Sequence, residues 1–215
     1  MDGEREGRAA VVAVMREMAA SGLNRGTAGN VSVRVGSAML ISPSAVPPGE
    51  LTEDLICRME LADDGGGWTG VRPPSSEWRF HRDLLRARPE AGAVVHCHSP
   101  YATVLAIGRR TIPAVHYMIA AFGGSTIRCS DYATFGTAEL SAAALAALDG
   151  RNGCLLANHG QLTVGPTSTR ALWLAVELEQ LAFQYHQALV LGDPVILSEE
   201  AIAETAAKFA GYGRG

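Results

Sequence analysis

The chain has 215 residues, of which 47% are hydrophobic and 19% are charged, and its formal net charge at pH 7 is −4. A chain of this size and composition can bury a substantial core, so we expect a single folded domain over residues 1–215 rather than a disordered chain. The negative net charge argues against a nucleic-acid partner, because a nucleic-acid surface would be basic.

Lysine is almost absent: Lys208 is the only lysine, and every other residue in the combined count of lysine and arginine is an arginine. Schiff-base catalysis needs an amine nucleophile, and a phosphate-binding P-loop needs a lysine directly after its glycines. Lys208 has no glycine-rich neighbourhood and lies near the end of the sequence. We therefore expect neither chemistry, and we expect Lys208 on a solvated helix.

The sequence indicates a cytoplasmic protein without a membrane partner. No apolar run reaches the roughly 18 residues of a membrane span. The first residues, MDGEREGR, lack the apolar region of a signal peptide. The four cysteines have no CxxC spacing, which favours buried free thiols in a reducing compartment. They are Cys57, Cys97, Cys129 and Cys154.

The first part of the chain combines one helix with several short strands. Apolar residues at helical spacing predict a helix over residues 5–21, which ends at Gly22. Alternating valines then predict a strand over 31–35, with a hairpin partner at 39–41. Two more short strands are expected at 57–61 and 68–71, on either side of a turn.

The second part alternates helices with strands. Helices are predicted over residues 75–88, 100–108, 137–148, 168–191 and 198–210, with Ser75 and Ser198 as N-caps of the first and last. Strands are predicted at 93–98, 126–129 and 154–157. Because several strands are joined by short turns, we expect an α/β fold. It would be an α/β/α sandwich with a mixed, largely antiparallel central sheet.

The strand over residues 93–98 carries the pattern His-Cys-His. Residues two apart on a strand point to the same face, so His96 and His98 present two imidazoles side by side. Cys97 would point the other way, into the core. The pair suits a metal, although such a pair on its own also fits histidines that are satisfied in a core.

Three further motifs contain small polar residues or histidine next to a predicted turn. Asn158-His159-Gly160 places a histidine where a strand turns, although it also fits an ordinary turn. Pro74-Ser75-Ser76-Glu77 precedes a helix, where hydroxyl and N–H groups bind phosphate, or where they simply cap the helix. Gly26-Thr27-Ala28-Gly29-Asn30 is a glycine-rich turn without a dinucleotide fingerprint. Taken together, three histidines and one carboxylate suit a Zn²⁺ site.

These motifs resemble one family over nearly the whole chain. The matching segments are GTAGNVSVR, ISPSA, PSSEWRFH, RPEAGAVVHCH, IPAVHYMIAAFGG, YATFGT, NHG and ALWLAVELEQLA. They are similar to the class II aldolase/adducin family, and within it most similar to the L-fuculose-1-phosphate aldolase branch. One departure is Ser42-Pro43-Ser44-Ala45, where the family usually has Thr-Pro-Thr-Gly. An alanine that must adopt the glycine's backbone conformation there would be strained.

The resemblance implies a set of site residues. One Zn²⁺ per subunit would be held by His96, His98, His159 and Glu77. Glu77 would be a ligand in the resting state and the proton-transfer base once substrate displaces it. The phosphate and substrate site would comprise Thr27, Gly29, Asn30, Ser44, Ala45, Ser75 and Ser76. Tyr117 would be a general acid supplied by a neighbouring subunit, which implies a homotetramer with active sites at subunit interfaces. Tyr212 would help to close the site.

The activity implied by the resemblance is that of a metal-dependent aldehyde-lyase. It would reversibly cleave a ketose 1-phosphate, in the first place L-fuculose 1-phosphate, to dihydroxyacetone phosphate and L-lactaldehyde. Because lysine is not available for an iminium, zinc would accept the electrons of the breaking bond. The alternatives are an aldolase for 5-deoxyribulose or methylthioribulose 1-phosphate, a sugar-phosphate epimerase, a dehydratase, or a non-catalytic adducin-like module. The three histidines and Glu77 argue against the last.

Overall fold

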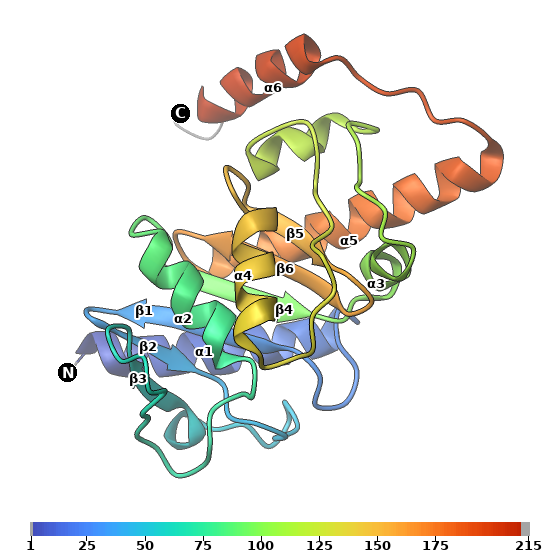
Figure 1. The fold of residues 1–215 in the computed structure, drawn as a ribbon. Coiled ribbons are helices and arrows are strands. Elements are labelled where there is room, and N and C mark those ends of the chain that lie inside the picture. The colour runs from blue at the N-terminus through green and yellow to red at the C-terminus, as the bar shows by residue number, and fades with distance from the viewer. Residues whose placement is uncertain (1, 212–215) are drawn as a thin grey trace.

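The protein is described from a computed structural model that covers residues 2–211. Its helices and strands alternate along the chain (Figure 1). The α-helices are α1 (Asp2–Ala20), α2 (Trp78–Ala87), α3 (Pro100–Ile107), α4 (Ala138–Ala147), α5 (Ser168–Leu191) and α6 (Glu199–Gly211). The strands are β1 (Asn30–Val35), β2 (Ala38–Ile41), β3 (Cys57–Glu60), β4 (Ala93–Cys97), β5 (Gly153–Leu156) and β6 (Gly160–Gly165). Two short 3-10 helices are η1 (Glu53–Leu55) and η2 (Tyr117–Phe122).

The strands form one six-stranded sheet in the order β3-β2-β1-β4-β6-β5. Every pair of neighbouring strands is antiparallel. Among the described residues, parallel pairing occurs only as an isolated bridge between Cys129 and Leu155. The expected α/β fold with a largely antiparallel sheet is therefore confirmed, because short turns join β1 to β2 and β5 to β6 and so reverse the chain direction.

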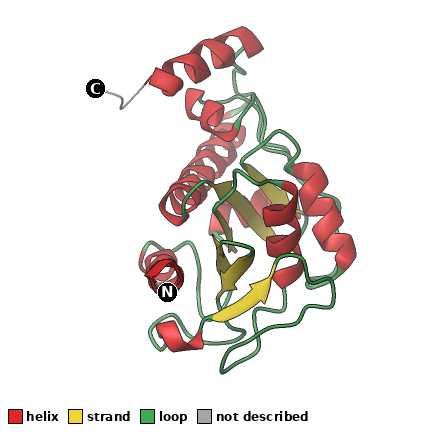
Figure 2. Cartoon of the chain, turned by 90° about the vertical axis from the view of Figure 1, so that its left-hand side faces the viewer, coloured by secondary structure: helices red, strands yellow, loops and turns green. Residues whose placement is uncertain are grey.

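Helices cover both faces of the sheet (Figure 2). Helices α2 and α4 pack on one face, where Phe80, Leu140 and Val94 belong to one hydrophobic cluster. Helices α1 and α5 pack on the other face, where Met18 and Val95 belong to a second cluster. Strand β4 alternates between the two clusters because successive side chains of a strand point to opposite faces. Burial on both faces explains why β4 is almost entirely apolar.

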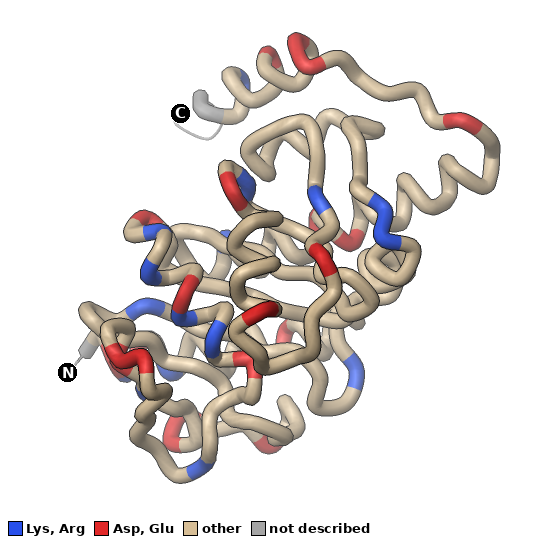
Figure 3. The backbone as a smooth tube through the Cα atoms, viewed as in Figure 1, with Lys and Arg blue, Asp and Glu red and all other residues tan. Residues whose placement is uncertain are grey.

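A third cluster joins α3, α5, η2 and α6 at the far end of the sheet from β3. Lys208 on α6 is exposed and pairs with Glu204 one helical turn earlier, at 2.7 Å. The four cysteines are free thiols, and only Cys129 among them is not fully buried. No described helix is long and apolar enough to cross a membrane. Acidic and basic positions are interleaved along the described chain (Figure 3).

Three local expectations differ from the structure. Residues 68–71 form no strand, since they pair only at a bridge between Arg58 and Thr69, and the next residue, Gly70, has φ 153°, outside the range of a strand. Residues 126–129 likewise contribute isolated bridges. The helix expected from Ser75 begins at Trp78 instead, because Ser75 forms a turn in which its carbonyl accepts the N–H of Trp78 at 3.1 Å. Glu77 therefore lies outside the helix.

Candidate active site

Four segments that are distant in sequence meet beside the end of β4. His96 is the fourth residue of β4, and His98 follows the strand. His159 lies in the turn between β5 and β6, and Glu77 directly precedes α2. The antiparallel pairing of β4 with β6 brings the turn next to the strand end. The register of the sheet and the position at which α2 begins thus bring all four side chains together.

The three imidazoles and the carboxylate form a compact cluster. The Nε2 atoms of His96 and His98 are 3.0 Å apart. The Glu77 oxygens lie 3.2 Å from His96 Nε2 and 3.3 Å from His159 Nε2. In each pair of imidazoles the ring centroids are separated by 4.8–4.9 Å. Three nitrogens and a carboxylate oxygen therefore converge on one point.

The convergence fits a tetrahedral metal ion. Ligand atoms bound to Zn²⁺ at about 2.0–2.1 Å in a tetrahedron lie about 3.3 Å from one another, close to the separations found here. Glu77 Oε1 is buried and accepts no hydrogen bond from the described residues. A bound cation would satisfy this oxygen. The residues present therefore fit a metal centre of the His₃-carboxylate type.

Protonation of the histidines is set by their surroundings. His96 Nδ1–H donates to the Gln161 carbonyl at 2.8 Å, which leaves the Nε2 lone pair facing the cluster. Burial lowers the pKa of His98 and of His159 to about 4, so both are neutral at pH 7 and able to bind a metal. Burial also opposes the charge on His96, but the adjacent Glu77 carboxylate outweighs it and raises the pKa of His96.

Glu77 is a buried carboxylate whose charge is stabilised by its neighbours. It is only 6% exposed, and burial alone would raise its pKa. The contacts with His96 and His159 and the N–H donated by Asn30 Nδ2 at 2.9 Å prevail and hold the pKa of Glu77 well below its usual range. Its backbone angles, φ −98° and ψ 14°, are in the bridge region, where many active-site residues are found.

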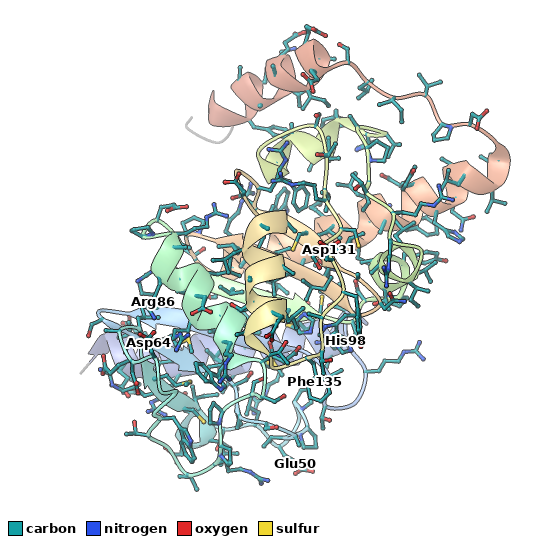
Figure 4. The ribbon with its side chains drawn as sticks, viewed as in Figure 1. Glu50, Asp64, Arg86, His98, Asp131 and Phe135 are labelled. Carbon is teal, nitrogen blue, oxygen red and sulfur yellow. The ribbon has the colours of Figure 1, made fainter. Side chains whose placement is uncertain are left out.

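The cluster faces a cavity of about 320 Å³. Its walls include every residue expected at the phosphate and substrate site: Thr27, Gly29, Asn30, Ser44, Ala45, Ser75 and Ser76. Glu77, His98 and His159 line it as well, whereas His96 lies fully buried behind them. In Figure 4, His98 and Phe135 lie close to each other beside the lower end of α4. No lysine or arginine is among the described residues that line the cavity.

The glycine-rich turn after α1 packs tightly against β4. Gly29 has φ 75°, and a Cβ atom there would lie 2.7 Å from the His96 carbonyl oxygen and collide with Asn24. Asn24 Oδ1 accepts the backbone N–H of His98 at 2.8 Å. The absence of a side chain at Gly29 therefore allows the turn to lie directly against the end of β4, where His96 and His98 are found.

One expected site residue does not line this cavity, and another lies outside the described residues. Tyr117 begins η2, is 49% exposed, and has its ring 4.6 Å from that of His116 and 6.3 Å from that of Phe209, between centroids. Within one chain it does not line the cavity. Tyr212 lies outside the described residues.

Sequence reasoning missed several residues of the site. Tyr132, Phe135 and Asn158 line the cavity, Asn24 holds the backbone at His98, and His81 contacts Asn30. Asn158 has φ 55° and directly precedes His159, so the Asn-His-Gly motif contained a signal for it. Tyr132 and Phe135 come from the segment Tyr-Ala-Thr-Phe-Gly, which forms no helix or strand. Its sequence has no periodic pattern from which its position beside the cavity could be predicted.

The site and the antiparallel sheet between two helix layers define a protein of α/β architecture with a group of three histidines and a carboxylate that could hold a metal ion. Residues 9–186 match the family model described as Class II Aldolase and Adducin N-terminal domain. The chain belongs to this family, and it is an enzyme of the aldolase class.

Named relatives support this placement over almost the full length. The chain is 50% identical to the 5-methylthioribulose-1-phosphate/5-deoxyribulose-1-phosphate aldolase of Rhodospirillum rubrum, over 96% of this chain and 92% of that protein. It is 48% identical to the L-fuculose phosphate aldolase of Escherichia coli K12, over 92% and 91%. A solved L-fuculose 1-phosphate aldolase structure superposes with a TM-score of 0.91 at 36% identity, covering 95% of this chain and 96% of that one.

The departure at Ala45 produces the strain expected for it. Ala45 has φ 56°, in the left-handed region that favours glycine. An alanine held in the left-handed region destabilises the folded state by about 1–2 kcal/mol. Glycine would remove this strain, but part of the gain is lost because glycine has more conformational freedom in the unfolded chain. We expect Ala45→Gly to raise the free energy of unfolding by about 0.5–1 kcal/mol in urea denaturation.

The matched control for this prediction is Ala133→Gly. Ala133 lines the same cavity, and its φ is not positive. The control should lower the free energy of unfolding by roughly 0.5–1 kcal/mol, since glycine adds freedom to the unfolded chain and removes a methyl group packed against the first cluster. Equal destabilisation by both substitutions would contradict the assignment of strain to Ala45.

Proposed function

We propose that this enzyme reversibly cleaves a ketose 1-phosphate to dihydroxyacetone phosphate and a short aldehyde. The observation that carries the proposal is the cluster of His96, His98, His159 and Glu77, in which His96 and Glu77 are buried and His98 and His159 face a cavity lined by hydroxyl groups. The metal would be zinc, one per subunit. This is the arrangement needed to accept negative charge beside a carbonyl without a lysine.

Two substrate classes are supported by relatives of similar identity. L-Fuculose 1-phosphate is our first candidate, supported by the 48% identical relative and by the solved structure with a TM-score of 0.91. 5-Methylthioribulose or 5-deoxyribulose 1-phosphate is the second, supported by the 50% identical relative. The common part of these substrates is the phosphorylated ketose end, so the cavity residues that hold it would act alike in both cases.

The phosphate would lie against the serines of two neighbouring turns. The backbone N–H groups of Ser44 and Ser75 are already donated to Pro73 and Ser42, each at 3.0 Å. The hydroxyl groups of Ser44, Ser75 and Ser76 would therefore be the donors to phosphate oxygens. Thr27, Gly29 and Asn30 would complete the site from the opposite turn. Because the reacting carbons are remote from the phosphate, this anchor would supply orientation.

A bound zinc ion would act as a Lewis acid that polarises the carbonyl and stabilises negative charge on its oxygen. In the condensation direction Glu77 would remove a proton from C3 of dihydroxyacetone phosphate. The contacts with His96, His159 and Asn30 keep the pKa of Glu77 low, so displacement from the two histidines would make it a stronger base. Asn30 Nδ2 would hold the carboxylate during this displacement.

The aldehyde oxygen would receive its proton from Tyr117 of a neighbouring subunit. This tyrosine is half-exposed and outside the cavity of its own chain, as a residue that serves another subunit would be. The proposal requires a homotetramer with active sites at subunit interfaces. A role for Tyr212 in closing the site belongs to the same proposal, and this enzyme would act in the cytoplasm.

The substrate is tested with a panel of ketose phosphates and a coupled assay for dihydroxyacetone phosphate. We expect cleavage of L-fuculose 1-phosphate with the highest kcat/KM, loss of activity after chelation, and recovery with added Zn²⁺. A higher kcat/KM for 5-deoxyribulose or 5-methylthioribulose 1-phosphate would establish the second candidate instead. Turnover without release of dihydroxyacetone phosphate would indicate an epimerase or dehydratase, and absence of both metal and turnover would indicate a non-catalytic module.

The role of Glu77 is tested with Glu77→Gln, which keeps the side-chain size but removes the base. We expect kcat to fall about 10²- to 10⁴-fold, the usual contribution of proton transfer by a positioned group. The control is Glu50→Gln on the surface, which should leave kcat unchanged. Metal content is measured in both. A Glu77→Gln protein with wild-type kcat would refute the role.

The role of Tyr117 is tested with Tyr117→Phe, compared with Tyr101→Phe. Both substitutions remove one hydroxyl group, but only the first should lower kcat, by about 10²-fold or more. Light scattering on the wild-type protein should give the mass of a tetramer. A fully active monomer would contradict the assignment of Tyr117 to a neighbour's site.

A further inference from the structure

His81 is a buried histidine that the proposed reaction does not use. It lies on α2, one helical turn after Glu77, and is completely shielded from solvent. Its two ring nitrogens both have partners: Nε2 is 2.5 Å from Asn30 Oδ1, and Nδ1 is 2.8 Å from Ser32 Oγ. It does not line the cavity. Its effect on the site must therefore pass through its contacts.

The chemistry of Asn30 determines the direction of these hydrogen bonds. The amide nitrogen of Asn30 donates to the Glu77 carboxylate at 2.9 Å, so the carbonyl oxygen Oδ1 must face His81. A carbonyl oxygen can only accept, and therefore His81 Nε2 carries the proton and donates it. Nδ1 then has a lone pair and accepts the Ser32 hydroxyl proton. The result is a directed chain from Ser32 through His81 and Asn30 to Glu77.

Burial keeps this arrangement in one protonation state. Removal from water lowers the pKa of His81 to about 3, so the ring is neutral and has a single N–H at pH 7. All members of the chain are buried: Ser32, His81, Asn30 and Glu77. Ser32 and His81 are completely shielded from solvent, so water does not compete for the hydrogen bonds of His81, and a buried group that lost its partner would be destabilised.

This chain of hydrogen bonds matters most when Glu77 moves. While the carboxylate lies beside Asn30, its negative charge alone favours the observed amide orientation. Once Glu77 has taken a proton from the substrate, its negative charge is lost and this preference weakens, whereas the N–H of His81 still holds Oδ1. The amide nitrogen of Asn30 has two N–H groups, and Glu77 accepts a hydrogen bond from one of them. The contact of His81 with Oδ1 also fixes the direction of the second N–H, which remains available to substrate in the cavity.

We propose that His81 is a positioning residue that fixes the amide orientation of Asn30, so that both N–H groups of Asn30 serve the site, one on Glu77 and one toward the substrate. This proposal rests on the proposed function, in which Glu77 transfers the proton. Partners of this kind commonly contribute 10- to 100-fold to activity, by order of magnitude.

The test compares His81→Gln with His81→Asn. The longer glutamine side chain can place an N–H near the position of Nε2 and donate to Asn30 Oδ1. The asparagine side chain reaches only the position of Nδ1 and can meet Ser32 but not Asn30. We expect His81→Asn to lower kcat about 10- to 100-fold with its metal content unchanged, and His81→Gln to restore it to within about threefold of wild type. Both variants bury an amide, so a purely structural role would affect them alike.

A double-substitution experiment asks whether His81 acts through Asn30. In the Asn30→Ala background, His81→Asn should lower kcat by less than about twofold, because the intermediary is gone. The full 10- to 100-fold loss in that background, or equal activities of His81→Asn and His81→Gln, would overturn the proposal.

A second readout does not depend on activity or on the variants folding. Long-range ¹H–¹⁵N NMR of the wild-type protein, with and without zinc, reports which ring nitrogen of His81 is protonated. We expect Nε2–H in both forms, with a nuclear Overhauser contact to the Asn30 side chain, and protonation on Nδ1 would overturn the proposal. If the enzyme cleaves no ketose phosphate, the proposed function fails, whereas the NMR result still decides whether His81 directs Asn30.

Discussion

The architecture around the active site depends on one buried carboxylate, Glu77. A charge removed from water is strongly destabilising unless it is paired and hydrogen-bonded, so the fold must bring partners to it from elsewhere in the chain. Strand β4 contributes His96, the β5–β6 turn contributes His159, and β1 contributes Asn30. Each contact ties a different part of the sheet to the segment just before α2.

The same contacts explain why the neighbouring elements are built as they are. His96 receives its orientation from the Gln161 carbonyl on β6, and the Gln161 side chain donates to Ser99 Oγ at 2.6 Å. Ser99 in turn donates to Glu179 on α5, which also accepts two backbone N–H groups at the start of α3. A hydrogen-bond network thus runs from the cluster of histidines and Glu77 to a helix in the layer on the other face of the sheet. Within this cluster, His96 is therefore part of the core.

Much of this could be predicted from local patterns. The two-residue spacing of His96 and His98 shows that they share a face, because strand geometry alone decides it. The bounds of α5 agree with apolar positions at helical spacing over residues 168–191. Residues 68–71 were predicted wrongly as a strand, because a strand needs a partner along its length and the pattern of one segment does not reveal where pairing ends. The start of α2 was also misplaced, since Ser75 has the composition of a cap but forms a turn.

By itself the amino-acid sequence determined the residue types available for chemistry: a histidine pair on one strand, a third histidine at a turn, a carboxylate before a helix, and no lysine for an iminium. Their family resemblance led to the class of enzyme. Only the tertiary structure decided that β4 pairs with β1 and β6, that Glu77 enters the core between His96 and His159, and that His81 and Asn24 support the site. The reason is physical: periodicity reports which face a side chain takes, whereas contacts between residues far apart in sequence depend on strand register and on how buried charges find their partners.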